Sequence, residues 1–228
     1  SRDALVCART QLINHVRGSV KPFGGRVPSC STESFHRRAV EGIPAPLKEV
    51  LSSILETIAT LSARIKAYEK QLEAIAKERY PQTALLSQPS GVGPLTSLGY
   101  VLVIEDPRRF KSSRAVGSYL GLRPRQGDSG SLQPQLRITK AGDVLLRRLL
   151  VGSAQYILGH FGPDTDLRRW GLALAQRGGK SAKKRAIVAV ARKLAVLLHR
   201  LWITGEVYEP LRQASKQVPN PVPQKLSA

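Results

Sequence analysis

The segment "RPRQGDSGSLQPQLRITK", residues 123–140, places one serine among several cations in a run without helical period. Ser129 could attack an electrophile only if its hydroxyl were deprotonated and the developing charge stabilised. The chain has no G-x-S-x-G turn and no evident Ser-His-Asp set, so acyl transfer is poorly supported. Phosphoryl transfer needs positive groups around the phosphate. The candidate groups here are Arg123, Arg125, Arg137 and Lys140. The alternative is an ordinary exposed serine in a glycine-rich loop.

A second candidate feature is the glycine turn in "QPSGVGPLTSLGYVL", residues 88–102. Gly91 and Gly93 precede an apolar helix, where glycine lets a ligand approach the backbone and free amides favour an anion. The hydrophobic–Gly–hydrophobic–Gly order is typical of a helix-hairpin-helix clamp on the DNA backbone. The alternative is a tight turn that needs glycine only for packing.

Cations also recur near the predicted starts of helices, where the helix dipole disfavours positive charge. Their placement suggests a compensating anion, although part of the set is expected to be solvated surface. The set comprises Arg108, Arg109, Lys111, Arg114, Lys140, Arg147, Arg148, Lys183, Lys184 and Arg185.

The composition makes nucleic acid the expected partner. The 228 residues carry a formal net charge of +20 and a pI near 10.7, and such a charge repels itself unless a polyanion screens it. No stretch reaches the ~18 apolar residues of a membrane span, and no signal peptide is visible. Two isolated cysteines and four scattered histidines favour free thiols in a reducing cytoplasm and no metal site in this chain.

These features predict a mainly α fold that contains a long helix with a heptad seam. Residues 3–18 are expected to form a helix and residues 19–45 a Gly/Pro/Ser-rich linker. Apolar residues in 46–80 alternate at spacings of four and three from Leu47 to Ile75, which is typical of a coiled coil. We prefer a partner helix from a second chain, hence a homo-oligomer; an intramolecular helical hairpin is the alternative.

Residues 81–209 are expected to form a compact helical domain, and residues 210–228 a disordered tail. The expected helices lie near 82–88, 93–105, 112–120, 140–160 (with Thr139 as N-cap), 164–177 and 181–203. The Gly-rich loop with Ser129 lies between the third and fourth of these helices. The chain begins inside an amphipathic pattern without methionine, which suggests a fragment.

The segments "SGVGPLTSLGYVL", "GLRPRQGDSGSLQPQLRITKAGD" and "AIVAVARKLAVLLHRL" closely resemble a family of bacterial insertion-sequence transposases. These proteins join an N-terminal RuvC-like domain with four acidic residues to a C-terminal domain with a catalytic serine. The resemblance implies that Ser129 is the nucleophile. It implies DNA and a guide RNA as partners, and a bacterial cytoplasmic location. It further implies Mg²⁺ in an acidic domain that this chain lacks, with residues 1–45 as the remnant helix and linker that follow it.

The chain departs from that family within the loop. Asp128 stands where the family usually has a first serine, and Ser131 and Leu132 stand where glycine and lysine usually follow. An inactive transposase remnant is therefore one alternative, and a non-catalytic nucleic-acid-binding module is another. A covalent protein–DNA adduct would distinguish catalysis from simple binding.

Overall fold

The computed structural model describes residues 1–127, 136–179 and 181–212. Within these ranges the chain is helical with no β-strand, apart from one isolated antiparallel bridge, so the predicted mainly α class is confirmed. The chain divides into two units, residues 1–74 and 75–228. None of the described helices is both long enough and apolar enough to cross a membrane.

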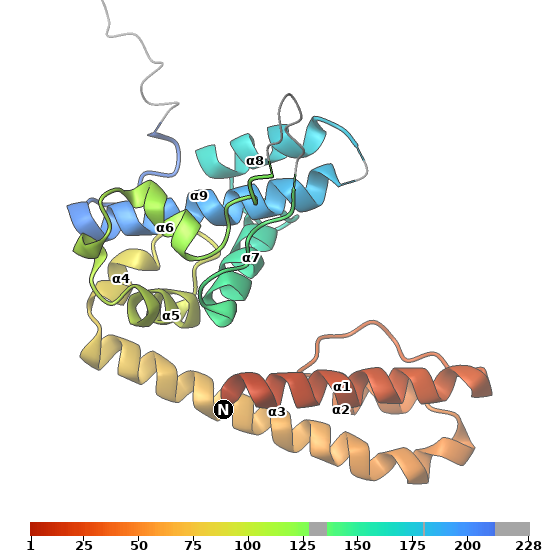
Figure 1. Ribbon diagram of the computed structural model, residues 1–228. Helices are drawn as coiled ribbons and strands as arrows, with labels where there is room; N and C mark the ends of the chain where they lie inside the picture. The colour runs from red at the N-terminus through yellow and green to blue at the C-terminus, as the bar shows by residue number, and fades with distance from the viewer. Residues whose placement is uncertain (128–135, 180, 213–228) are drawn as a thin grey trace, which may run out of the picture. The chain divides into compact units, whose positions relative to one another are not determined.

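The first unit is built on an antiparallel pair of helices, α1 (Arg2–Val20) and α3 (Ala45–Arg79) (Figure 1). Arg2 pairs with Glu69 and Arg9 donates to Ser62, so seven steps along α1 match seven steps back along α3. The same register brings two apolar sets together in one core. The set from α1 is Ile13, Val16 and Val20, and the set from α3 is Leu51, Leu55 and Ile58.

This pairing shows which helix packs on the heptad seam of α3. Leu51 and Ile58 occupy seam positions and are buried against apolar residues of α1. The sequence interpretation preferred a partner from a second chain, but over this part of the seam the structure contains the intramolecular alternative. The pattern of α1 is short and interrupted by Arg9, which concealed it as the partner.

The expected linker 19–45 is folded. It contains η1 (Lys21–Phe23), α2 (Phe35–Arg38) and η2 (Ala39–Gly42). Phe35, Ala39 and Ile43 are buried in the core of the first unit. Their spacing of four places them on one side of a helical segment, so burial of a few apolar residues overrides the Gly/Pro/Ser composition.

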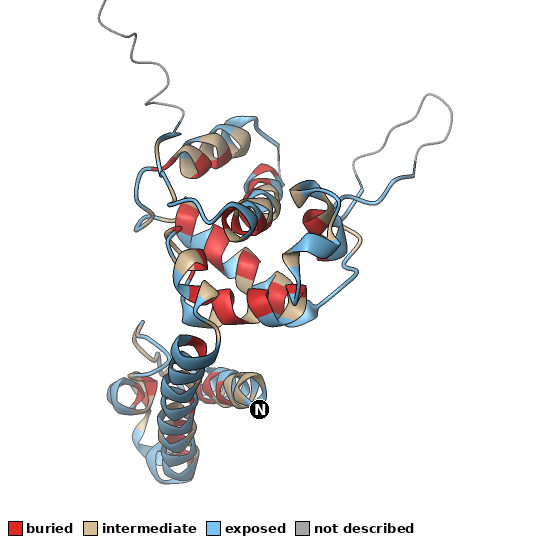
Figure 2. Cartoon of the chain, turned by 90° about the vertical axis from the view of Figure 1, so that its left-hand side faces the viewer, coloured by how far each residue is buried: buried red, intermediate tan, exposed pale blue. Residues whose placement is uncertain are grey.

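In the second unit, α9 (Ala182–Thr204) is the helix around which the others pack. Its buried face includes Ala186, Val190, Leu194 and Leu198. Figure 1 shows shorter helices around this helix, which is drawn in blue, and Figure 2 shows in red the buried residues on the sides of the helices that face one another. The shorter helices are α4 (Gln82–Leu86), α5 (Pro94–Ile104), α6 (Ser113–Tyr119), α7 (Val144–Leu158) and α8 (Asp166–Gln176), with η3 (Pro107–Arg109) before α6.

The helix predicted over 140–160 is shorter than expected, and Thr139 is not its N-cap. α7 begins at Val144, and the Asp143 carboxylate accepts a hydrogen bond from the Leu146 amide at 2.6 Å. Thr139 instead donates its backbone N–H to the carbonyl of Arg123 at 2.9 Å. Of the tail predicted over 210–228, residues 213–228 lie outside the described residues, and the carbonyl of Pro210 accepts a bond from the Asp166 amide.

Candidate nucleic-acid interface

Two short segments pair in antiparallel fashion between α6 and α7. Pro124 and Ile138 form the bridge, the Arg125 amide donates to the Arg137 carbonyl at 2.9 Å, and the Thr139 amide donates to Arg123. We call residues 123–125 and 137–139 the hairpin stem. The stem brings Arg123, Arg125 and Arg137 together, although they are up to fourteen positions apart in the sequence.

The alternation of the paired backbone places these three arginines on one face. Side chains of neighbouring residues in an extended pair point to opposite sides. Ile138 is partly buried against the core of the second unit, so its face is the inner one. Arg123, Arg125 and Arg137 belong to the other face, and all three are exposed. They therefore offer three guanidinium groups to solvent on one short surface.

A close crossing of the chain fixes the base of the stem. Gly121 and Gly142 have φ angles of +68° and +75°. A β-carbon on Gly121 would overlap the backbone of Ala141, and one on Gly142 would overlap the carbonyl oxygen of Tyr119. The Lys140 amide completes the crossing by donating to the Gly121 carbonyl at 3.1 Å. Only glycine fits both positions without strain.

Arg147 ties this crossing to α7. Its Nη1 donates to the carbonyl oxygens of Ala141 at 2.7 Å, Leu120 at 3.2 Å and Gly142 at 3.5 Å. The sequence assigned Arg147 to phosphate binding, but in the structure its guanidinium binds backbone carbonyls on both sides of the crossing. Its evident task is to hold the base of the stem together.

Two other cations at this end are exposed. Lys140 adopts a left-handed backbone conformation with φ +59°, which is uncommon for a residue other than glycine. Its side chain is exposed next to the base of the stem, and that of Arg148 is exposed on α7. Ser129, together with Asp128, Ser131 and Leu132, lies outside the described residues, in the segment that connects the two sides of the stem.

The basic start of α9 lies toward the same end of the domain as the base of the stem. The Cγ of Arg192 lies 2.9 Å from where a β-carbon on Gly117 of α6 would be, so the aliphatic part of this side chain packs on α6. α6 leads directly to the base of the stem. Arg185 is two turns before Arg192 on nearly the same face of α9. Lys183, Lys184 and Arg185 are all exposed in the first turn. In the sequence Arg192 is one of several cations of this helix and adjoins Lys193, and only its contact with α6 shows that its aliphatic part packs there.

The cations before α6 and in its first turn divide into two kinds. Arg109 lies over the rings of Phe110 and Tyr119, at 5.0 and 4.7 Å from their centroids, and 3.8 Å from Glu105. It therefore stabilises local packing. Arg108, Lys111 and Arg114 are exposed, as the predicted basic surface requires.

The two glycines of the 88–93 turn have different surroundings. Gly91 has φ +86°, and a β-carbon there would lie 3.0 Å from both the Ser153 carbonyl oxygen and a ring carbon of Tyr156. Gly91 is therefore required for close packing of the turn against α7, which was the alternative to a phosphate clamp. Gly93 is exposed, precedes α5 as its N-cap, and has open space where a β-carbon would be. Only Gly93 leaves the backbone accessible to a ligand.

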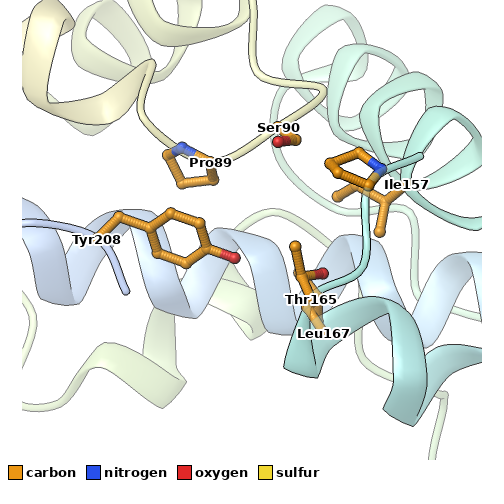
Figure 3. A pocket seen from close by; sticks show the side chains of 7 residues that line it. Pro89, Ser90, Ile157, Thr165, Leu167 and Tyr208 are labelled. Atoms are coloured by element: carbon orange, nitrogen blue, oxygen red, sulfur yellow. The ribbon is translucent and has the colours of Figure 1, made fainter. Parts of the chain in front are cut away.

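The other side of this turn lies against Tyr208, which belongs to the segment that follows α9. Pro89 and Ser90 face Tyr208, whose hydroxyl points toward Thr165 at the start of α8 (Figure 3). Burial raises the pKa of Tyr208, and a hydrogen bond with Thr165 opposes that shift. The residues around it fill the space with side chains, which gives this side of the turn a packing role.

Residues suited to metal binding do not gather in the described part of the chain, where no three His, Cys, Asp or Glu side chains form a potential metal site.

The positive charge of the chain is unevenly divided between the two units. Residues 75–228 contain 25 of the 36 Lys and Arg but 9 of the 16 Asp and Glu. The second unit therefore carries most of the positive charge.

A known protein family matches the part of the chain that contains the hairpin stem. The family model for the Transposase IS116/IS110/IS902 family matches residues 83–168, which include the glycine turn, the stem and all of α7. Over these residues the chain is similar to the IS116/IS110/IS902 transposase family. The expected resemblance to insertion-sequence transposases is thereby confirmed.

Relatives of the whole chain agree with this assignment. The chain is 33% identical over 214 residues to the transposase for insertion sequence element IS1111A of Coxiella burnetii. It is 33% identical over 217 residues to a probable family 20 transposase of Pseudomonas aeruginosa. These alignments cover 91% and 92% of this chain but 58% and 63% of the relatives. A pilin gene-inverting protein of Moraxella lacunata is 32% identical over 117 residues, which are 51% of this chain and 35% of that protein.

Proposed function

We propose that this chain is the DNA-binding and strand-transfer part of an insertion-sequence transposase. The observation that carries the proposal is the hairpin stem, whose exposed face collects Arg123, Arg125 and Arg137 at the two ends of the segment that contains Ser129. Three guanidinium groups on one surface suit the charge of a phosphodiester. The family match over the same residues supports a transposase function.

The proposed reaction uses Ser129 as the nucleophile. Its oxygen attacks a DNA phosphorus, a serine–phosphate bond forms, and one phosphorus–oxygen bond to deoxyribose breaks. The serine gives up its proton and the leaving deoxyribose oxygen gains one. The phosphoserine link conserves the energy of the broken bond, so a second strand can later be joined by the reverse step. The arginines of the stem orient the phosphate and balance its charge.

The relatives' names favour a reaction that rejoins DNA over one that only cuts it. Two pilin gene-inverting proteins, from Moraxella lacunata and Moraxella bovis, are 32% and 30% identical over about half of this chain. Inversion of a gene needs four broken strands to be resealed in a new order. A covalent protein–DNA intermediate meets that need without an external energy source.

DNA contacts outside the stem would come from the exposed basic surface. We propose that Lys140, Arg148, Lys183, Lys184 and Arg185 contact the phosphate backbone, and that Gly93 allows its close approach near the start of α5. Arg147 and Gly91 support the fold beneath these contacts. Such contacts give affinity without reading sequence, so target choice must come from elsewhere. A guide RNA encoded by the element is the proposed source.

Mg²⁺ and an acidic metal-binding domain are also proposed for the complete enzyme. The chain spans about 60% of the length of the Coxiella burnetii and Pseudomonas aeruginosa transposases, and its described residues hold no cluster that fits the ion. The homo-oligomer stays a proposal as well. Since α1 covers the seam as far as Glu69, oligomer contacts would use its later positions, such as the partly exposed Ile75.

Strand exchange by the complete gene product tests the proposal. Ser129→Ala should abolish exchange of element ends, whereas Ser131→Ala, two positions further along, should leave it within about two-fold of the unsubstituted protein. DNA affinity should stay unchanged in both variants, because neither serine carries charge. If the Ser129→Ala variant exchanged strands as well as the unsubstituted protein, Ser129 would not be the nucleophile.

The second candidate function is nucleic-acid binding without catalysis. The departures at Asp128 and Leu132 favour it, because they change the charge of the loop next to Ser129. It predicts the same dependence of affinity on salt, with a log–log slope of roughly 0.9 per neutralised phosphate of duplex DNA. It predicts no covalent adduct under any condition, and adduct formation therefore separates the two functions.

A further inference from the structure

A turn in the first unit displays an aromatic ring between two cations. Residues 21–26, with the sequence KPFGGR, follow α1, and we call them the aromatic turn. The side chain of Phe23 is 57% exposed, and Lys21 and Arg26 on either side of it are exposed. Single exposed apolar residues are common on protein surfaces, and the cations on either side of this ring are what make it a candidate binding feature.

The backbone of the aromatic turn is held in place from several sides. Gly24 has φ +73° and donates its amide to the Lys21 carbonyl at 3.0 Å, and the Gly25 amide donates to the Val20 carbonyl at 2.9 Å. A β-carbon on Gly25 would lie 2.7 Å from Cδ of Pro44. The turn is therefore packed against the residues that precede α3. The exposure of Phe23 follows from this fixed backbone and not from a loose loop.

The core of the first unit is filled without Phe23. Phe35 from α2 is fully buried there, and the guanidinium of Arg17 lies 5.4 Å from the centroid of its ring. The fold therefore uses one phenylalanine for packing and presents the other to solvent.

The charges around the aromatic turn are mostly positive and unbalanced. No acidic side chain in the described residues lies within ion-pair distance of Lys21 or Arg26, and the nearby Glu41 lies 3.7 Å from Arg38. Arg37 on α2 is a further exposed cation on the same folded connector. Lys21 and Arg26 thus flank the ring in the sequence, whereas charged residues are depleted at the centre of protein-binding patches.

We propose that the aromatic turn binds a single-stranded segment of nucleic acid. One unstacked base lies on the ring of Phe23, while Lys21 and Arg26 neutralise the phosphates on either side. Base stacking on an aromatic ring beside cations is the general means by which proteins hold single strands without reading sequence. Duplex DNA keeps its bases stacked inside the helix and offers no base to this ring. The site is independent of Ser129 and lies in the other unit of the chain.

Charge reversal in the full chain tests the role of the two cations. The double variant Lys21→Glu/Arg26→Glu is compared with Lys66→Glu/Lys70→Glu, which makes the same change of charge on α3. By the register of α1 and α3, residues 66 and 70 lie near the start of α1, whereas the aromatic turn follows its end. Fluorescence anisotropy of a 20-nucleotide oligo(dT) should show about 10-fold weaker binding for the first variant only. Its log–log salt slope should fall by about 1.4, at roughly 0.7 per single-strand phosphate.

A second measurement tests the ring itself. Phe23→Ala should weaken oligo(dT) binding about 10-fold with no change in the salt slope, while Tyr68→Ala, a partly exposed aromatic on α3, should change it less than two-fold. A photoreactive benzoyl-phenylalanine at position 23 should crosslink to oligo(dT) or oligo(U), and one at position 68 should not. Comparison of the two oligonucleotides shows whether the site favours DNA or RNA.

Three results would overturn the proposal. These are equal loss of affinity in both charge-reversed variants, weakening of duplex binding alone, and crosslinking of position 23 to protein only. The Ser129→Ala variant should bind oligo(dT) normally. A failure of the aromatic turn is thus distinguishable from a failure of the proposed catalysis.

Discussion

Replacement of Arg147 by alanine tests whether the base of the hairpin stem depends on this side chain. One nitrogen atom donates to the carbonyls of Leu120 and Ala141, which lie on opposite sides of the crossing, and more weakly to Gly142. A hydrogen bond from a charged donor contributes about 1.5–3 kcal/mol. Since Arg147 is only half-buried and a single nitrogen is shared among the three carbonyls, we take about 2 kcal/mol for the whole set.

The stem should therefore open more often without unfolding of the domain. The Lys140 amide, which donates to Gly121, is a direct reporter of that opening. A loss of about 2 kcal/mol corresponds to roughly 30-fold faster hydrogen exchange at this amide. Amides in the middle of α9 should exchange at unchanged rates. Lys183→Ala, which removes a cation elsewhere, serves as the control. An unchanged exchange rate at Lys140 in the Arg147→Ala variant would refute the assignment of Arg147 as the support of the stem.

Three further predictions concern stability. Gly142→Ala should lower the unfolding free energy by more than about 1 kcal/mol because of its φ of +75° and its overlap with Tyr119, whereas Gly152→Ala in the open middle of α7 should raise it slightly; urea unfolding compares the two. Burial raises the pKa of Tyr100 well above its usual value of 10, so its contribution to stability should be lost as the pH rises above 10. When the unsubstituted protein is titrated to high pH and followed by tyrosinate absorbance, one tyrosine should ionise only as the protein unfolds. The Tyr100→Phe variant should lack this step. Arg9→Leu should leave the melting temperature unchanged or raise it, because Arg9 is buried with Ser62 as its one hydrogen-bond partner among the described residues; a clear decrease would show that the buried charge stabilises the first unit.

Much of the fold could be predicted from periodicity. The long α3 and the buried face of α9 follow from apolar residues repeating at three and four positions. The partner of α3 could not be found in this way, because α1 presents only a short apolar stripe with Arg9 inside it. Nor could the folding of residues 21–44, where three buried apolar residues outweigh a composition typical of linkers.

The candidate site was predictable in its residue types and less so in their roles. Clustered arginines near a serine favour a phosphate-binding hypothesis, which stays a prediction, and pairing of the stem brings three of these arginines to one face. Arg147 has the same charge, and only its distances to three carbonyls reveal a structural role. Likewise, Gly91 and Gly93 are alike in the sequence, and only the contacts of α7 separate a packing glycine from an accessible one.

The most direct test of the central claim is to find the atom that carries the DNA. The complete protein is incubated with element ends, quenched in denaturant, and digested with nuclease and trypsin before mass spectrometry. Cleavage after Arg125 and Arg137 releases residues 126–137, which contain both Ser129 and Ser131. We expect a nucleotide remnant on that peptide, and fragmentation should assign it to Ser129. A remnant on Ser131, on another peptide or on none would contradict it.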